Sequence, residues 1–548
     1  MEKKTTTSKT KKRRLTAKQW RIISLVVLVV QAVVELITLI TAGKTGMLPT
    51  KYMAAIALIF ILLLFLEAQL LMYKYTKTKR RKTGKVRRII GFVLAGISIL
   101  LCIYISLFLG KVNSTIEDMT DDTVTISEVA GVYVLTDDPA QKIKDAADYT
   151  FAYTTVYGDE TTMEAIDAIN EETGSDIETV EYDSVTEMVD ALYAGDVQAM
   201  IMDETYEAVV NDTEGYEGFS EKSRIIYEHT RSYTEQKEDS NLDVTEDPFC
   251  VYISGSDTRS AKLAKSRSDV NILAFVNPKT KQILLLNTPR DYYVDISIAK
   301  GQKDKLTHCG LYGVDCSEDT LANLYGLDKI DFYVQMNFEG FKKLIDELGG
   351  VTVVSEESFT SIHDANYSYV KGENYVDGQA ALYFVRERYH LSGGDLTRGR
   401  HQMALISAVV DKVTGSTKLL TNYGGIMDSL EGMFSTDIGQ EDISGLVNMQ
   451  LSDGGKWTVK SFAVDGEGTS AKTYSMPTKN AYVMLQNQEK IDKAKTLIDK
   501  IYNGETITDE DLQYSCENQK TAKSQRGDLD VFLYQSMQEK LPMADPMH

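Results

Sequence analysis

Residues 249–293 read FCVYISGSDTRSAKLAKSRSDVNILAFVNPKTKQILLLNTPRDYY, and this stretch decides the fold class of the larger part of the chain. It contains three short apolar runs, at 249–255, 270–277 and 282–289, each of which leads into polar or turn-forming residues. Continuous apolar runs of this length are typical of strands that are buried on both faces. Loops that follow such strands in α/β sheets commonly carry the active site.

Helical patterns follow these strands. In NFEGFKKLIDELGG, residues 337–350, apolar side chains recur every three or four positions until two glycines end the pattern. Residues 401–413, HQMALISAVVDKV, predict a longer helix that runs on from a charged loop, and KWTVKSFAV at 456–464 predicts another strand. We therefore predict an α/β domain at 249–504 with a mixed central sheet flanked by helices. Residues 505–548 are polar and predict a peripheral tail.

A smaller domain is predicted upstream, because strand-like and helix-like patterns alternate between residues 149 and 210. This alternation is typical of an α/β unit and predicts an accessory domain at 131–240. The segment ALYAGDVQAMIMDE, residues 191–204, also resembles part of a periplasmic solute-binding lobe. Ligand binding and a role as a spacer or docking module therefore both stay open for this domain.

Three apolar segments near the N-terminus have the length of membrane spans: Ile22–Ala42, Tyr52–Met72 and Ile89–Gly110. A helix of about 20 residues crosses roughly 30 Å of hydrocarbon. We expect an all-α region of three transmembrane helices at 22–110, followed by a linker at 111–130. Three full-length spans without a small-residue cleavage site do not fit a cleaved signal peptide.

The charge distribution predicts how the chain lies in the membrane. The first 110 residues carry a net charge of +17, concentrated in a basic tail at 1–21 and in the loop KYTKTKRRKTGKVRR at 74–88. The positive-inside rule places both in the cytoplasm and everything after Lys111 outside. The chain as a whole carries −21, so the remaining 438 residues carry −38. Such an acidic outer part argues against nucleic-acid binding, which needs a basic surface.

Two other features resemble functional sites but have a simpler structural explanation. Glu35 and Glu67 lie within the predicted spans, and we expect them to face neighbouring helices or an interface rather than to form a functional pair. Cys309 and Cys316 lie near a histidine and an aspartate, but no paired CxxC spacing supports a metal site. We interpret these cysteines as unpaired or singly bridged structural residues.

Arginine and aspartate gather around the predicted strand ends of the larger domain. Seven arginines lie in or beside the segments GSDTRSAKLAKSRSD, NTPRDYYVDI and VRERYHLSGGDLTRGR: Arg259, Arg267, Arg290, Arg386, Arg388, Arg398 and Arg400. Arginine binds phosphate through a planar fork of donors, and aspartate holds a hard cation such as Mg²⁺ that shares the phosphate oxygens. In so acidic a domain, this pattern favours a pyrophosphate site over a surface of solvated ion pairs.

Four ordered segments, 255–260, 267–294, 305–351 and 381–402, resemble the LytR-CpsA-Psr family. The resemblance covers roughly residues 249–504. The layout of three spans, an accessory domain and this domain is similar to the capsule-attachment members of that family. Individual motifs such as TPRD are weak, but their shared order makes the resemblance specific.

The resemblance implies a Mg²⁺-dependent (or Mn²⁺-dependent) phosphotransferase that moves a glycan from an undecaprenyl-pyrophosphate carrier to peptidoglycan outside the membrane. It implies that Asp257 and Asp269 hold the metal, and it names Asp291 and Asp395 as further candidate residues of the site. The residues that it implies for the pyrophosphate are Arg267, Arg290, Arg386, Arg388, Arg398 and Gln402. Of all these, Asp257, Asp269, Arg290 and Arg388 are the predicted catalytic residues.

Other functions are compatible with the same residues. A hydrolase of the polyprenyl pyrophosphate needs the same site, with water in place of the sugar hydroxyl. A carrier-binding protein without turnover fits the arginines but not the paired carboxylates. A membrane-bound transcriptional regulator needs a cytoplasmic DNA-binding module, for which the 21 residues before the first span are too few. The expected partners are the lipid-linked glycan, peptidoglycan, the membrane and capsule or wall-polymer assembly proteins, but no nucleic acid.

Overall fold

Of the 548 residues, the computed structural model describes 16–46, 48–72, 81–119, 123–156, 160–211, 213–236, 242–256, 265–416, 426, 430 and 433–513. The chain forms two compact units, Met1–Glu505 and Thr506–His548. In the described part of the second unit lies one short helix, α16 (Asp509–Leu512), which the side chain of Thr508 caps. All other elements belong to the first unit.

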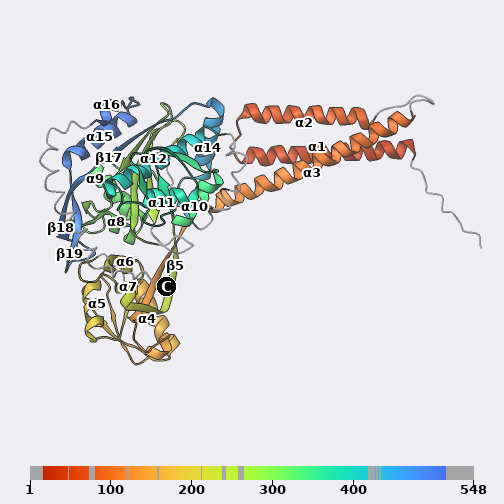
Figure 1. The fold of residues 1–548 in the computed structure, drawn as a ribbon. Coiled ribbons are helices and arrows are strands. Elements are labelled where there is room, and N and C mark those ends of the chain that lie inside the picture. The colour runs from red at the N-terminus through yellow and green to blue at the C-terminus, as the bar shows by residue number, and fades with distance from the viewer. Residues whose placement is uncertain are drawn as a thin grey trace, which may run out of the picture. The chain divides into compact units, whose positions relative to one another are not determined.

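Three long helices begin the chain: α1 (Ala17–Lys44), α2 (Thr50–Leu71) and α3 (Arg81–Met119), red to orange in Figure 1. Each contains a stretch that is long and apolar enough to cross a membrane. Their outward side chains include many exposed leucines, isoleucines and valines, a surface that suits lipid rather than water. The three predicted apolar spans therefore coincide with helices that can anchor the chain in a membrane.

Polar side chains lie between these helices. Glu35 and Glu67 are 2% and 0% exposed. Glu35 Oε1 accepts a hydrogen bond from Gln31 Nε2 at 2.8 Å and another from Ser98 Oγ of α3 at 3.3 Å. Hydrogen bonds between helices contribute to association in lipid, where water is absent. The prediction that Glu35 faces a neighbouring helix is confirmed.

A five-stranded sheet forms the accessory domain, with strand order β3-β2-β4-β1-β5. Strand β2 is parallel to β3 and β4, whereas β1 is antiparallel to β4 and β5. The strands are β1 (Thr123–Leu135), β2 (Thr150–Tyr153), β3 (Glu178–Glu181), β4 (Ala199–Asp203) and β5 (Ser223–Gln236). The helices are η1 (Ile143–Ala146), α4 (Glu160–Thr173), α5 (Val185–Ala194), α6 (Thr205–Asn211) and α7 (Phe219–Lys222).

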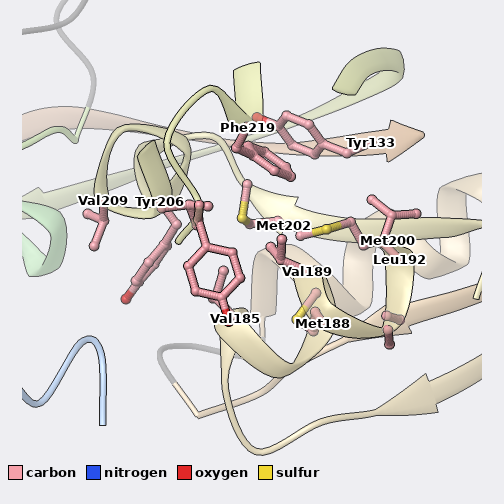
Figure 2. Packing of buried hydrophobic residues seen from close by; sticks show 14 of the residues in the cluster. Tyr133, Val185, Met188, Val189, Leu192, Met200, Met202, Tyr206, Val209 and Phe219 are labelled. Atoms are coloured by element: carbon pink, nitrogen blue, oxygen red, sulfur yellow. The ribbon is translucent and has the colours of Figure 1, made fainter. Parts of the chain in front are cut away.

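Alternate residues of β4 point into two separate cores. Met200 and Met202 pack against α5 and α6, as Figure 2 shows with Met188 of α5. Ala199 and Ile201 belong to the core on the opposite face, which contains apolar residues of α4. Side chains alternate along a strand, so a continuous apolar run is the pattern of a strand covered on both faces. This confirms the predicted α/β character of the domain.

The predicted linker at 111–130 differs from the structure. Helix α3 continues to Met119, and β1 already begins at Thr123. Strand β1 is this long because it pairs with β5 along its whole length, from Thr123 opposite Gln236 to Leu135 opposite Ser223. A polar segment becomes a strand when a partner supplies its backbone hydrogen bonds, and a single-sequence pattern does not reveal that partner.

The larger domain is built on a six-stranded mixed sheet with strand order β16-β11-β6-β7-β8-β17. Strands β6, β7 and β8 are successive antiparallel neighbours, whereas β11 is parallel to β6 and β17 is parallel to β8. Their bounds are β6 (Phe249–Ser256), β7 (Ser268–Asn277), β8 (Gln282–Asn287), β11 (Phe332–Met336), β16 (Phe434–Thr436) and β17 (Thr458–Ala463). The strands predicted from the three apolar runs and from KWTVKSFAV are confirmed.

Helices cover both faces of this sheet, which confirms the predicted fold class. Apolar residues of α12 and α14 pack on one face, and α15 contacts the other through pairs such as Phe275 and Tyr502. The helices are α8 (Leu306–Cys309), η2 (Gly310–Tyr312), α9 (Val314–Tyr325), α10 (Phe338–Glu347), α11 (Gly378–Arg386), α12 (Asp395–Thr414), α14 (Gln440–Asp453) and α15 (Gln488–Tyr502).

Four small antiparallel ladders complete the domain. They pair β9 (Tyr293–Asp295) with β10 (Lys303–Lys305), β12 (Val351–Ser355) with β15 (Gly372–Val376), β13 (Phe359–Thr360) with β14 (Ser368–Tyr369), and β18 (Gly466–Lys472) with β19 (Asn480–Gln486). Cysteines form no disulfide among the described residues, where Cys102, Cys250, Cys309 and Cys316 are buried free thiols. Cys516 lies outside the described residues.

Candidate active site

The candidate site lies at one edge of the six-stranded sheet, where β7 begins and β8 ends. These two strands are antiparallel and place Ile272 opposite Asn287. Asp269 near the start of β7 therefore lies beside Arg290, which follows β8. Arg290 Nη1 is 2.9 Å from Asp269 Oδ1. Pairing of the two strands thus brings together an aspartate and an arginine that are 21 residues apart.

Helix α8 holds this ion pair from the side. Thr307 Oγ1 donates to Asp269 Oδ1 at 3.4 Å, and the Thr307 backbone N–H donates to the Arg290 carbonyl at 2.8 Å. On the other side of Arg290, its Nε is 3.8 Å from Asp291 Oδ2, and Lys305 Nζ is 3.4 Å from Asp291 Oδ1. Nothing in the local sequence distinguishes Thr307 or Lys305 from other polar residues, so they were not predicted.

The first turns of α12 bring a second arginine to the same place. Arg398 is 7% exposed, and its Nη2 is 2.6 Å from Asp395 Oδ1 at the start of the helix. The helix approaches the sheet closely at Gly399, where a Cβ would meet Asn287 Cγ at 2.9 Å. A side chain at Gly399 would therefore push Arg398 away from the strand ends.

The charges at this edge determine one another's protonation. Burial alone would raise the pKa of Asp269. The guanidinium groups of Arg290, Arg398 and Arg267 outweigh burial and hold that pKa well below its usual range. Burial alone would lower the pKa of Arg290, but three surrounding carboxylates, led by Asp269, raise it instead. Asp269 is therefore an anion and Arg290 a cation throughout the physiological pH range.

Two buried donors of this cluster are unused within the part of the chain that the structure describes. Arg290 Nε and Arg398 Nε are inaccessible to solvent and make no hydrogen bond there. Burial lowers the pKa of Arg398, and the charges of Arg290 and Arg388 add to this effect. Arginine nonetheless stays protonated in proteins, so both donors belong to cations. Buried cations with spare N–H groups fit an anionic ligand with several oxygens.

Two further arginines lie at the end of α11 and just after it: Arg386 is the last residue of the helix, and Arg388 belongs to the loop that follows. Glu387 is completely buried, and its carboxylate accepts backbone N–H bonds from four residues: Ile362, Arg388, Tyr389 and His390. These bonds shape the loop between Arg386 and His390. Arg386 lies over the Phe338 ring, with its guanidinium carbon 4.4 Å from the ring centroid. Arg386 and Arg388 were predicted from the sequence, whereas Glu387 between them was not, because the sequence does not show that its carboxylate binds four backbone N–H groups.

Comparison with known proteins identifies the chain. The model of the LytR_cpsA_psr family matches residues 216–498, which is more than half of the sequence. The chain belongs to this family. A relative from Bacillus licheniformis, the polyisoprenyl-teichoic acid–peptidoglycan teichoic acid transferase TagU, is 34% identical over 40% of this chain and 70% of its own length. The protein of the same name from Halalkalibacterium halodurans is 31% identical over 47% of this chain and 81% of its own.

A solved structure is also similar. The crystal structure of B. subtilis TagU is 27% identical in sequence and covers 48% of this chain and 100% of that chain, with a TM-score of 0.37. Family membership was expected from the motifs between 255 and 402, and it is confirmed by the family match and by the two TagU relatives.

The predicted site residues of this family member differ in how far the structure brings them together. Asp269, Arg290, Arg267 and Arg398 act on one another's charge at the sheet edge, and Arg388 contributes through Arg398. Gln402 Nε2 donates to the Val385 carbonyl at 3.3 Å, so it contacts α11. Asp257 and Arg259 lie outside the described residues. Arg400 belongs elsewhere, because its Nε is 2.8 Å from Glu356 on the surface.

A metal ion is compatible with one described carboxylate. Mg²⁺ and Mn²⁺ prefer anionic oxygen ligands, and Asp269 is an ionised carboxylate whose low pKa suits this role. Among the described residues, no group of three or more histidine, cysteine, aspartate or glutamate side chains is arranged to hold a metal. A metal site shared by Asp257 and Asp269 therefore stays a prediction, in which Asp269 supplies the described ligand.

Proposed function

We propose that this family member transfers a phosphate-linked glycan from a polyprenyl-pyrophosphate carrier to a hydroxyl of peptidoglycan. The observation that carries the proposal is the pair of buried arginines, Arg290 and Arg398, whose Nε donors make no hydrogen bond in the described part of the chain. The relatives support the same reaction, because their names describe transfer of teichoic acid from a polyisoprenyl carrier to peptidoglycan. The three N-terminal helices support a substrate that lies in a membrane.

In the proposed step, the acceptor hydroxyl oxygen attacks the phosphorus that carries the glycan. A new P–O bond forms, the bond to the bridging oxygen breaks, and its electron pair leaves with the polyprenyl phosphate. The hydroxyl proton passes in the same reaction to water or to the leaving polyprenyl phosphate, whose new terminal oxygen can accept it. Negative charge grows on the phosphoryl oxygens and on the leaving phosphate, and Arg290 and Arg398 stabilise it. Arg267 and Arg388 extend this positive surface towards the substrate.

Asp269 has a positioning role in this proposal rather than that of a proton acceptor. A general base works best when its pKa is close to the working pH. The arginines hold the pKa of Asp269 far below that value, so its carboxylate is a weak base. It instead orients Arg290 and supplies an oxygen ligand for Mg²⁺ or Mn²⁺. A metal ion bound there would neutralise charge on the pyrophosphate.

We further propose that the glycan is capsular polysaccharide or a similar wall polymer and that the domains after α3 lie outside the cell. The accessory domain that precedes the catalytic domain is the reason for proposing capsular polysaccharide as the glycan, whereas the relatives are named for teichoic acid. The basic residues around the first and third apolar helices motivate the orientation. The same arrangement of arginines would also serve a hydrolase, in which water replaces the acceptor hydroxyl.

The test is a reconstituted reaction with the full chain in detergent. The protein is incubated with an undecaprenyl-pyrophosphate-linked glycan, Mg²⁺ and peptidoglycan fragments, and products are followed by mass spectrometry. Linked glycan supports the transferase, and the reaction without metal tests the cofactor. Release of lipid phosphate without linkage would assign a hydrolase, and neither product would leave a binding or regulatory role.

Matched arginine variants show whether the activity comes from this site. Arg398→Ala removes a buried guanidinium of the cluster. Arg400 lies two positions further along the same helix and pairs with Glu356, so Arg400→Ala removes a guanidinium outside the cluster. We expect Arg398→Ala to lose roughly 100-fold in activity or more, because one charge-stabilising group is lost. Activity should persist in Arg400→Ala. Equal activity in both variants would contradict the proposed site.

A further inference from the structure

A cavity separate from the arginine cluster is lined mostly by the accessory domain and also by Lys265, Leu311 and Tyr312 of the larger domain. Its volume is about 420 Å³, within the range of small-molecule sites. It is found where β2 and β4 end and α4 begins, through residues such as Thr154, Asp203 and Thr162. Strands β2 and β4 are parallel, and ligands of open α/β sheets bind at the carboxyl ends of such strands.

The charged residues of this cavity neutralise one another. Lys265 Nζ is 2.6 Å from Glu128 Oε1, and Arg231 forms an ion pair with Glu160. The remaining charged lining residue, Asp203, is half-buried, and its carboxylate accepts the Thr205 hydroxyl at 2.7 Å and the Thr205 N–H at 2.9 Å. Burial raises the pKa of Asp203. No cation is left over for an anionic ligand, in contrast to the arginine cluster.

The rest of the lining combines hydroxyl groups with aromatic rings. Threonine hydroxyls come from Thr154, Thr161 and Thr162, and tyrosine rings from Tyr206, Tyr233 and Tyr312. Apolar side chains of Val185, Ile201, Met202 and Leu311 fill the space between them. Hydroxyls and paired charges donate and accept hydrogen bonds, and rings pack against C–H faces. This combination fits a neutral ligand that is rich in hydroxyl groups and has apolar faces.

We propose that this cavity binds sugar residues of a neutral glycan segment. Two sources carry that chemistry in the proposed reaction, the glycan on the lipid carrier and the glycan strand of peptidoglycan. The binding itself does not depend on the proposed transfer, because it concerns a separate cavity. The proposed function enters only in the choice of these two glycans as probes.

The cavity is connected to the arginine cluster through the chain. Lys265, which pairs with Glu128, lies two residues before Arg267 and four before Asp269. Leu311 and Tyr312 of the lining belong to η2, which directly follows α8 with Thr307. A glycan held here would stay close to the residues that act on its pyrophosphate or on its acceptor, which raises its effective concentration at the site.

The experiment measures glycan binding to the full chain in detergent by isothermal titration calorimetry. One probe is the N-acetylglucosamine–N-acetylmuramic acid disaccharide of peptidoglycan with its lactyl carboxylate converted to the neutral amide, and the other is the glycan released from the lipid carrier by mild acid. Arg388→Ala is included as a background in which transfer is expected to fail. Binding of a probe in that background, weakened by cavity variants, supports the cavity even where transfer fails.

Two cavity variants and one matched control decide the outcome. Thr154→Val with Thr162→Val removes two lining hydroxyls without changing their volume, and Thr162→Trp fills the cavity. Thr173→Val makes the same exchange at the far end of α4, where the hydroxyl bonds to the Ile169 carbonyl. We expect the double variant to bind roughly tenfold more weakly or worse, and the control to bind normally.

Each result has a definite meaning. Weakening by the double variant or by Thr162→Trp, with unchanged thermal unfolding, supports the cavity, and the probe that binds identifies the source of the glycan. Absence of binding by both probes overturns the proposal. So does binding that both cavity variants leave unchanged.

Discussion

Arg290 and Arg388 belong to the same predicted site but differ in what surrounds them. The side chain of Arg290 is 12% exposed and forms an ion pair with a carboxylate that is 24% exposed. The side chain of Arg388 lies over the Tyr389 ring, and its Nη2 donates to the Tyr389 hydroxyl at 2.6 Å. Loss of the first leaves a carboxylate without its partner, whereas loss of the second leaves an exposed tyrosine.

The two arginines should therefore separate stability from activity. We expect Arg290→Ala to lose transfer and to lower the free energy of unfolding by about 3 kcal/mol, because Asp269 keeps its charge without its partner. Arg388→Ala should also lose transfer, but its free energy of unfolding should change by only about 0.5 kcal/mol. Denaturant unfolding and the reconstituted reaction measure both quantities. Equal stability of the two variants would contradict the different environments of the two side chains.

His401 of α12 makes the stability of the folded chain depend on pH. It stacks on Phe384 with ring centroids 4.3 Å apart and is completely buried. Burial lowers its pKa from 6.5 to about 4, and Arg400 adds to this effect. Between these two pH values the unfolded chain binds a proton at this position and the folded chain does not. Folding stability therefore decreases as the pH falls from about 6.5 to about 4.

The expected loss over this pH range is about 3 kcal/mol. Thermal unfolding of the full chain from pH 7 to pH 4 measures it. His401→Phe keeps the ring stack without the titrating nitrogen, so its unfolding should depend less on pH. Asp269 does not add to the pH dependence of stability above about pH 4. Its pKa is lower in the folded chain than in the unfolded chain, so its contribution to stability is lost only when the pH falls below the ordinary pKa of aspartate. An identical pH dependence in His401→Phe would assign the effect to other groups.

At the scale of elements, the site depends on how closely α12 approaches the end of β8. Gly399 permits this approach at Asn287, and Gly394, with φ of 54° and ψ of −126°, precedes the helix in a conformation that favours glycine. The charged segment DLTRGR was predicted as a loop before the helix, but it forms the first turns of α12. Arg398 is therefore held by helical backbone rather than by a loop.

Gly399→Ala tests this contact. We expect it to lower the free energy of unfolding by about 1–3 kcal/mol and to reduce activity, because the added methyl group displaces α12 from Asn287. Gly96→Ala is a matched exchange within α3, where a Cβ meets nothing within 4 Å. Circular dichroism thermal melts compare the two variants. A Gly399→Ala protein with normal stability and activity would show that the close approach is unnecessary.

At the scale of the whole molecule, the N-terminal helices set where the chemistry can occur. Three helices with apolar surfaces anchor the chain, and the basic segments predict which side each loop faces. In the proposed reaction the polyprenyl carrier would lie in the same membrane, so anchoring would confine enzyme and substrate to one surface. The part of the chain after residue 110 carries a net charge of −38, which contrasts with the arginines gathered at the candidate site.

Protease digestion of wall-stripped cells tests this arrangement. We expect externally added protease to degrade the chain after Lys111, while a tag at the N-terminus stays protected until detergent is added. The basic loop between α2 and α3 should be protected as well. Immunoblots against both ends of the chain measure the result. Full protection of the C-terminal domains would overturn the predicted orientation.

Local pattern was sufficient wherever a structural property depends on neighbouring residues. Consecutive residues alone predicted several elements, because hydrophobic period and length can be read from the local sequence. These elements are the apolar spans, strands β6, β7 and β8, and the amphipathic helix α10. The candidate arginines were predictable as types at strand ends, and the order of the motifs identified the family.

Only the tertiary structure decided which of these residues meet. Asp269 and Arg398 are 129 positions apart, and they act on each other because α12 packs against the sheet edge. Glu387 and Thr307 became part of the site through contacts that no spacing reveals, and Arg400 left it by pairing with Glu356. Long-range pairing also made the second half of the expected linker, from Thr123 onward, part of β1. Charge and periodicity are properties of the local sequence. Which side chains meet at one site depends on packing between segments that are distant in the chain.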